Sequence, residues 1–342
     1  MKKNLELCQI QNGNLNILIG THALLEDKVK FHNLGIAIID EQHRFGVAQR
    51  SKMWQKNTLP PHILVMTATP IPRTLAMSVY GDLDISVIDE LPPGRKEVKT
   101  VHRNDNNRLA VFKFMKQEIE KGRQVYVVYP LIQESQAMDY KDLMDGYESI
   151  SREFPVPKYQ ISIVHGKMKA TDKEYEMQRF VKGQTQIMVA TTVIEVGVNV
   201  PNASIMVIES SERFGLSQLH QLRGRVGRGT SPGLCLLVSN SEELTPARER
   251  LNAVAATVDG FELSRIDLEQ RREGDVLGRN QSGTQSHLRL LRVLRDESLI
   301  EQARDDAEQL IAKDNDLTNY PLLRKELEQL QRDQAVDYLD KG

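Results

Sequence analysis

The hydrophobic positions of the chain fall into short runs rich in valine and isoleucine, and longer stretches with helical spacing separate these runs. In the first part of the chain we predict strands at residues 16–19, 35–39, 62–66 and 84–88. A second series of strands is predicted at residues 98–102, 125–129, 161–165, 187–190, 205–208 and 234–238. Strands that alternate with helices are typical of βαβ units, so both parts indicate an α/β fold with mostly parallel sheets.

Proline positions and charge divide the chain into parts. Residues 91–95 read Leu-Pro-Pro-Gly-Arg, and paired prolines continue neither a helix nor a central strand. After residue 243 the predicted strands stop, and charged helical segments follow, for example at 301–313 and 322–337. We therefore expect a first α/β block at 1–91, a linker at 92–97, a complete α/β domain at 98–243 and a helical region at 244–342.

Composition narrows the class of protein. The 342 residues are 40% hydrophobic and 27% charged, which is typical of a soluble globular chain of about two domains. No apolar run approaches the ~18 residues that span a bilayer, and no signal peptide is recognisable, so we expect a cytoplasmic protein without membrane contact. Cys8 and Cys235 have no CxxC or histidine-rich neighbour, so we expect buried thiols and neither a disulfide nor a zinc site. Because the net charge is only −2, any nucleic acid must be bound by local basic clusters.

Two adjacent acids follow the predicted strand at 35–39. Asp40 and Glu41 would lie at the carboxyl end of a buried parallel strand, where α/β proteins bind their ligands. In nucleotide-hydrolysing sites this is the Walker B arrangement, in which the first acid holds Mg²⁺ and the second polarises the attacking water. On its own the pattern is weak, because most strands that end in Asp-Glu are simply solvated there.

The residues that follow are far more specific. Residues 40–47 read DEQHRFGV, and residues 67–75 read TATPIPRTL. With these two segments the sequence resembles the superfamily 2 helicases, and more narrowly the RecG branch, of which they are similar to motifs II and III. The related transcription-repair coupling translocase typically carries a second acid where Gln42 stands, so Gln42 followed by His43 favours RecG.

The second block resembles the same family. Residues 190–201, ATTVIEVGVNVP, are similar to motif V, and residues 218–229, QLHQLRGRVGRG, are similar to motif VI with its QxxGRxxR pattern. We expect Arg225 and Arg228, at i and i+3, to share one helix face. Their guanidinium groups can bind phosphate oxygens bidentately. The resemblance implies that Arg228 is an arginine finger and that Arg225 contacts the γ-phosphate.

The resemblance implies roles for further residues. Besides Asp40, Glu41 and the two arginines, contacts to the nucleotide are expected at Gln221, Gly197 and Asn199. Contacts to the DNA backbone are expected at Thr21, His22, His165, Lys167, Thr191 and Thr192. Residues expected to couple nucleotide state to DNA are His43, Thr67, Thr69, Arg271 and Gln281. Two positions depart from the family pattern, because many relatives have Asp at Asn199 and the usual Gly-Pro after Arg271 is Arg272-Glu273 here.

A motor of this class also needs a phosphate loop of the form GxxxxGK[ST], and the sequence contains none. Residues 19–24, IGTHAL, resemble motif Ib, and the chain begins just upstream of them, as if the phosphate-binding half of the first lobe had been removed. The oligonucleotide-binding wedge domain of RecG has no counterpart either. The fold expected from the resemblance is thus tandem RecA-like helicase lobes with parallel sheets, the first lobe truncated, followed by a carboxyl-terminal helical region.

Three hypotheses for function follow. The chain is part of a RecG-type ATP-dependent DNA helicase, or a non-catalytic DNA-binding fragment, or a piece of the transcription-repair coupling translocase. For the first, the resemblance implies ATP and Mg²⁺ as ligands, branched DNA such as forks and Holliday junctions as partner, and a monomeric protein. Contacts to DNA are expected to be mostly to phosphate, with little sequence preference.

Overall fold

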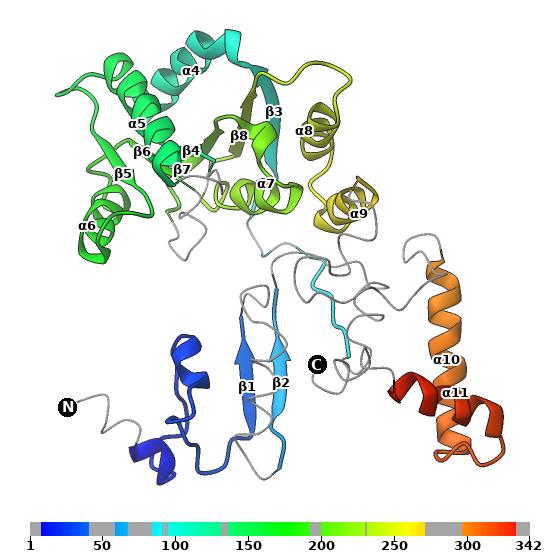
Figure 1. The fold of residues 1–342 in the computed structure, drawn as a ribbon. Coiled ribbons are helices and arrows are strands. Elements are labelled where there is room, and N and C mark those ends of the chain that lie inside the picture. The colour runs from blue at the N-terminus through cyan, green and yellow to red at the C-terminus, as the bar shows by residue number, and fades with distance from the viewer. Residues whose placement is uncertain are drawn as a thin grey trace. The chain divides into compact units, whose positions relative to one another are not determined.

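The computed structural model describes residues 8–40, 59–67, 84–90, 92, 95–130, 136–191, 200–229, 231–270 and 296–332. The chain divides into two compact units, one of residues 86–272 and the other of residues 1–85 together with 273–342 (Figure 1).

The unit 86–272 is built on a six-stranded sheet in which every neighbouring pair of strands is parallel. Its strands are β3 (Val98–Asn104), β4 (Gln124–Tyr129), β5 (Ile161–Val164), β6 (Ile187–Thr191), β7 (Ala203–Ile208) and β8 (Gly233–Ser239). Their order across the sheet is β3-β8-β7-β4-β6-β5. All six strands predicted for the second block are thereby confirmed.

Helices cover both faces of this sheet (Figure 1). They are α4 (Arg108–Glu120), α5 (Gln136–Glu153), α6 (Ala170–Val181), α7 (Leu216–Arg223), α8 (Pro246–Ala256) and α9 (Gly260–Gln270). Along β4, Val125 and Val127 pack in one core with α4 and α5, whereas Tyr126 and Val128 pack in the other core with α6, α7 and α8. Burial on both faces explains why the central strands β4, β6 and β7 read as continuous apolar runs, whereas β3 carries exposed polar residues.

The helices that follow the last strand belong to the same unit. Leu251 and Val254 of α8 and Leu263 of α9 are buried in the core that also holds Leu219 of α7. Pro246 occupies the first turn of α8, and the Thr245 hydroxyl accepts a hydrogen bond from the Arg248 N–H, so the helix begins with a capped end. The compact unit therefore continues past residue 243.

The other unit contains η1 (His22–Leu25), β1 (Ile36–Ile39) and β2 (His62–Val65). The two strands pair in parallel, with Ile36 opposite His62, which confirms the predictions at 35–39 and 62–66. The strands predicted at 16–19 and 84–88 are wrong, because the backbone there forms no strand. Ile17, Ile19 and Ile88 are 76%, 91% and 92% exposed, so these apolar residues pair with no neighbouring strand among the described residues.

Two helices close the described part of the chain, α10 (Glu297–Lys313) and α11 (Pro321–Arg332). They confirm helices where 301–313 and the first part of 322–337 were predicted; residues 333–342 lie outside the described residues. Cys235 is a buried thiol as expected, but Cys8 is exposed, so that half of the cysteine prediction is wrong. Within the described ranges, every helix is too short or too polar to cross a membrane.

Gly146 in α5 makes a close approach that only glycine allows. A Cβ atom at this position would lie 2.2 Å from Cζ of the buried Tyr129 ring. Alanine normally stabilises a helix interior by up to ~1 kcal/mol relative to glycine. Here we expect Gly146→Ala to lower the free energy of unfolding by about 1–3 kcal/mol, because the overpacked ring must move. Urea denaturation followed by circular dichroism measures this change.

The control for this variant removes the ring. In a Tyr129→Leu background, Gly146→Ala should no longer destabilise the protein. A Gly146→Ala protein as stable as the wild type would show that the Tyr129 ring does not limit this position.

Candidate functional site

Polar residues gather where the strands of the unit 86–272 end. Thr191 is the last residue of β6, Ser239 is the last residue of β8, and Glu209 directly follows β7. His165 directly follows β5. Because all the strands are parallel, these residues lie along the same edge of the sheet, where α/β proteins place their ligand sites.

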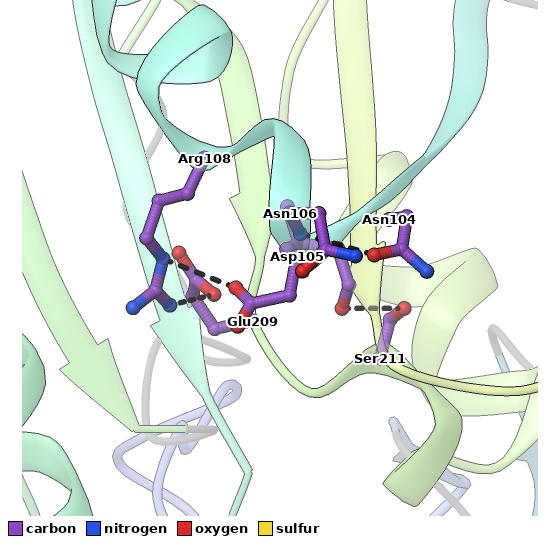
Figure 2. A network of polar contacts seen from close by, with 7 residues as sticks. Asn104, Asp105, Asn106, Arg108, Glu209 and Ser211 are labelled. Carbon is purple, nitrogen blue, oxygen red and sulfur yellow. Dashed lines mark hydrogen bonds and ion pairs between the residues drawn. The ribbon is translucent and has the colours of Figure 1, made fainter.

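A buried ion pair fixes the start of α4 to the end of β7 (Figure 2). The Glu209 side chain is 4% exposed, and its Oε2 accepts a 2.5 Å hydrogen bond from Arg108 Nη2. Arg108 Nε lies 3.2 Å from Asp105 Oδ1, so one guanidinium joins two carboxylates. Burial raises the pKa of Glu209, and the neighbouring Arg108 opposes this shift. Removing the guanidinium would leave a buried, uncompensated charge, which is strongly destabilising.

The turn after Glu209 is held in an unusual backbone conformation. Ser210 has a φ of 47°, in the left-handed region that non-glycine residues rarely adopt. Beside it, Ser211 Oγ donates a 3.0 Å hydrogen bond to the Val238 carbonyl of β8 (Figure 2). This turn leads through η5 (Ser211–Arg213) into α7, so the ion pair and the serine bond set where α7 begins.

Residues 165–167, which directly follow β5, form a loop that we call the basic loop. Lys173 Nζ donates a 3.1 Å hydrogen bond to the Gly166 carbonyl, which folds the first turn of α6 back onto the loop. Burial lowers the pKa of His165, and the positive charges of Lys173 and Lys167 lower it further. These three side chains thus lie close together, as binding to the phosphates of a nucleic-acid backbone requires.

Thr191 shares this edge of the sheet. Its side chain is 2% exposed, and its Oγ1 has no hydrogen-bond partner among the described residues. A buried hydroxyl without a partner costs free energy, so such atoms often mark ligand sites or ordered water. Its predicted neighbour in DNA binding, Thr192, lies outside the described residues.

The structure corrects the expected position of the two motif VI arginines. Helix α7 ends at Arg223, and Gly224 caps it, so Arg225 and Arg228 lie in the following loop and share no helix face. Gly227, three residues beyond this cap, adopts a φ of 73°, in the left-handed region that favours glycine. We call residues 224–229 the arginine loop.

The two arginines nevertheless come together. Burial lowers the pKa of Arg228, and the positive charges of Arg225 and Arg95 lower it further. Burial raises the pKa of Tyr126 to about 12, against the opposing effect of both loop arginines. Among the described residues, neither Arg225 nor Arg228 forms an ion pair with a carboxylate. As far as the described residues show, the loop therefore offers positive charge that no carboxylate compensates.

Arg223, the residue before the loop, is an important residue that the sequence analysis missed. It is 3% exposed and donates hydrogen bonds of 2.8 and 2.6 Å to the carbonyls of Val254 and Thr257 at the end of α8. A third bond, 3.3 Å long, reaches the Val258 carbonyl. These carbonyls have no partner within the helix, so the guanidinium caps α8 and ties it to α7. The signal in the sequence was a charged residue four positions after Leu219, on the buried face of the helix.

His220 completes this arrangement. Arg223 Nη2 lies 2.7 Å from His220 Nδ1, and since arginine can only donate, Nδ1 accepts and the ring proton is on Nε2. Burial, followed by the charge of Arg223, lowers the pKa of His220 to about 4. The imidazole is therefore neutral over the physiological pH range.

The remaining predicted site residues are scattered over both units. In the unit 1–85, Asp40 follows β1 and Thr67 lies two residues beyond β2; both are exposed, and the parallel register Ile39 to Val65 brings these strand ends side by side. Thr21 is exposed at the start of η1, which contains His22. Gln221 is half-buried on α7. The predicted residues that lie outside the described residues are Glu41, His43, Thr69, Thr192, Gly197, Asn199, Arg271 and Gln281.

Comparison with protein families matches three segments of the chain. Residues 1–78 match the DEAD/DEAH box helicase family, and residues 108–230 match the helicase conserved C-terminal domain. Residues 257–339 match domain 3, C-terminal, of the ATP-dependent DNA helicase RecG.

Curated relatives cover nearly the whole chain. The ATP-dependent DNA helicase RecG of Aquifex aeolicus is 49% identical over 92% of this chain and 40% of its own length. For RecG of Synechocystis the identity is 46%, over 94% of this chain and 38% of the relative. For RecG of Bacillus subtilis it is 45%, over 95% of this chain and 48% of the relative. The chain thus spans less than half the length of the curated relatives it matches.

A solved structure agrees with these relatives. The structure of RecG bound to a three-way DNA junction is 41% identical in sequence and has a TM-score of 0.66. The match covers 88% of this chain and 38% of that chain.

The histidine beside Arg223 makes stability depend on pH. Its pKa is about 4 in the folded chain and 6.5 in the unfolded chain, so the unfolded state binds the proton more tightly. The stabilisation is fully present above pH 6.5 and should be lost as the pH falls from 6.5 towards 4. We expect His220→Asn, which keeps an acceptor near the position of Nδ1, to reduce this loss, as measured by denaturation midpoints across that range.

A second histidine adds to the same trend. Burial, followed by the charge of Arg248, lowers the pKa of His102 to about 4, so part of the pH dependence remains in His220→Asn and should be smaller still in the double variant with His102→Asn. An unchanged pH profile in His220→Asn would show that His220 does not titrate with folding.

Proposed function

We propose that this chain is a portion of an ATP-dependent DNA helicase that remodels branched DNA such as replication forks and Holliday junctions. The chain belongs to the RecG family and spans less than half the length of its curated relatives. The observation that carries the proposal is identity of 45–49% over more than nine-tenths of the chain to proteins named RecG. A structural relative at 41% identity is bound to a three-way DNA junction. Membership of the RecG family also removes the coupling translocase from the alternatives.

The proposed ligand of the arginine loop is the polyphosphate of ATP. Arg225 and Arg228 carry charge that no carboxylate neutralises within the described ranges, which suits a phosphate group that gains negative charge during transfer. We assign Arg225 to the γ-phosphate and Arg228 to the charge of the transition state. Asp40 would hold Mg²⁺ and Glu41 would orient and polarise the attacking water. The metal ion, when bound, neutralises charge on the phosphate oxygens.

The proposed DNA-binding surface is the edge of the sheet that carries the basic loop and Thr191. Lysine and histidine side chains beside a hydroxyl suit the repeated phosphates of a backbone and read no base edges. On this basis the chain would bind DNA with little sequence preference. Arg271 and Gln281 are proposed to couple this surface to nucleotide state.

ATP turnover tests the first part of the proposal. The sequence contains no GxxxxGK[ST] loop, so we expect the 342-residue chain alone to show no DNA-stimulated ATP hydrolysis. In a longer form that carries such a loop, Arg228→Ala should lower turnover roughly 10³-fold or more, because an arginine finger stabilises transition-state charge. The measurement is phosphate release with and without branched DNA.

Matched variants show which part of the assignment fails. Arg103 is an exposed arginine on β3, so Arg103→Ala should leave ATP turnover unchanged. Unchanged turnover in Arg228→Ala would overturn the finger assignment. A robust rate from the 342-residue chain that Glu41→Gln abolishes would overturn the expectation that this chain is inactive.

The salt dependence of DNA binding tests the second part. Affinity for a three-way junction should fall steeply as salt rises, because phosphate contacts release counterions. We expect Lys167→Ala to weaken binding for all sequences alike and to reduce the slope of log K against log salt by about 1. Lys182→Ala is the matched control, because Lys182 caps the carboxyl end of α6, at the opposite edge of the sheet. Equal slopes for the wild type and Lys167→Ala would remove the basic loop from the DNA surface.

A further inference from the structure

A third arginine reaches the arginine loop from a distant part of the chain. Arg95 lies in the segment that leads into β3, and its Nη2 donates a 2.7 Å hydrogen bond to the Gly224 carbonyl. The same carbonyl accepts a 3.2 Å hydrogen bond from Arg228 Nε. One backbone oxygen therefore holds two guanidinium groups whose residues are far apart in sequence.

Close backbone packing fixes the position of Arg95. A Cβ atom on Gly227 would lie 2.9 Å from Val98 Cγ2 and 3.3 Å from the Lys96 carbonyl oxygen, so the loop rests directly on the segment after Arg95. On the other side, the Arg95 N–H donates a 3.1 Å hydrogen bond to the Pro92 carbonyl. The Arg95 backbone is thus held by a turn on one side and by the arginine loop on the other.

The three arginines form a cluster of like charge. Arg95 and Arg225 both lower the pKa of Arg228, and in the described part of the chain none of the three pairs with a carboxylate. Like charges held together destabilise the folded chain, and a neutral donor would serve as well to bond the Gly224 carbonyl. Arg95 also has four further N–H donors, because a guanidinium has five.

We propose that Arg95 is a third phosphate-binding residue of the nucleotide site and contacts the polyphosphate together with Arg225 and Arg228. This inference rests on the proposed function, in which the arginine loop binds ATP. It extends the site to the segment 92–97, which we expect to link the two helicase lobes. A bound polyphosphate would then restrain that segment directly, without an intermediary element.

The test measures binding of inorganic tripolyphosphate to the full 342-residue chain by calorimetry at low salt. Arg95→Gln keeps an N–H donor for the Gly224 carbonyl but removes the charge, and we expect it to weaken tripolyphosphate binding roughly tenfold, as the loss of one charged hydrogen bond implies. Arg95→Lys keeps the charge without the planar fork and should bind with intermediate affinity. Arg103→Gln makes the same charge change on the exposed face of β3 and should bind like the wild type.

A measurement of stability separates binding from a purely structural role. Because Arg95→Gln relieves repulsion among the arginines, its thermal midpoint without ligand should equal or exceed that of the wild type. A lowered midpoint together with unchanged affinity would make Arg95 a structural anchor and overturn the inference.

Two further comparisons distinguish this inference from the proposed function. If Arg228→Gln weakens tripolyphosphate binding and Arg95→Gln does not, the inference is wrong and the assignment of the loop stands. If only Arg95→Gln weakens binding, Arg95 binds phosphate without Arg228, which overturns both the shared site and the role of Arg228. No tripolyphosphate binding by the wild type overturns both. Weaker binding of duplex DNA by Arg95→Gln, with tripolyphosphate binding unchanged, would assign Arg95 to the DNA backbone and also overturn the inference.

Discussion

Parallel pairing of six strands is the constraint on which the unit 86–272 depends. Because each strand must return to the same end of the sheet, every loop that follows a strand emerges at one edge, and His165, Thr191 and Glu209 arrive there from different parts of the chain. Helices on both faces exclude water from the central strands β4, β6 and β7, which are buried along their whole length, whereas β3 carries exposed polar residues. Most of the candidate site residues of this unit lie along this edge and in the loop after α7.

Buried charged side chains then fix helices to the sheet and to one another. Arg108 and Glu209 form an ion pair that joins α4 to the end of β7, whereas Arg223 bonds backbone carbonyls at the end of α8. Breaking either interaction is costly, because it would leave a buried polar group without its partner. The arginine loop lies directly after one of these fixed points, so its backbone starts from a rigid position. Its own arginines remain without acidic partners in the described residues, as an anion site requires.

Sequence patterns predicted the six strands of the sheet because each contains a short run with β-branched or other apolar residues, between segments with helical spacing. They failed at 16–19 and 84–88, since a β-branched run becomes a strand only where a neighbouring strand pairs with it. The motifs located Arg225 and Arg228 but not their conformation, because α7 ends at Arg223, before the i, i+3 spacing can place them on a helix. Arg223 and Arg95 were missed because their partners are backbone carbonyls, whose positions the sequence does not indicate. For Arg223, the spacing from Leu219 indicated only its place on the buried helix face.

The cap that Arg223 places on α8 has a mechanical meaning. Three hydrogen bonds from one buried guanidinium hold the end of α8, and the same side chain sits one residue before Gly224. Separating α8 from α7 would leave carbonyls at the end of α8 without partners and a buried guanidinium without its acceptors. We therefore expect α7 and α8 to unfold as one cooperative unit. A force applied to the helices that follow the sheet would therefore be transmitted through Arg223 to the arginine loop.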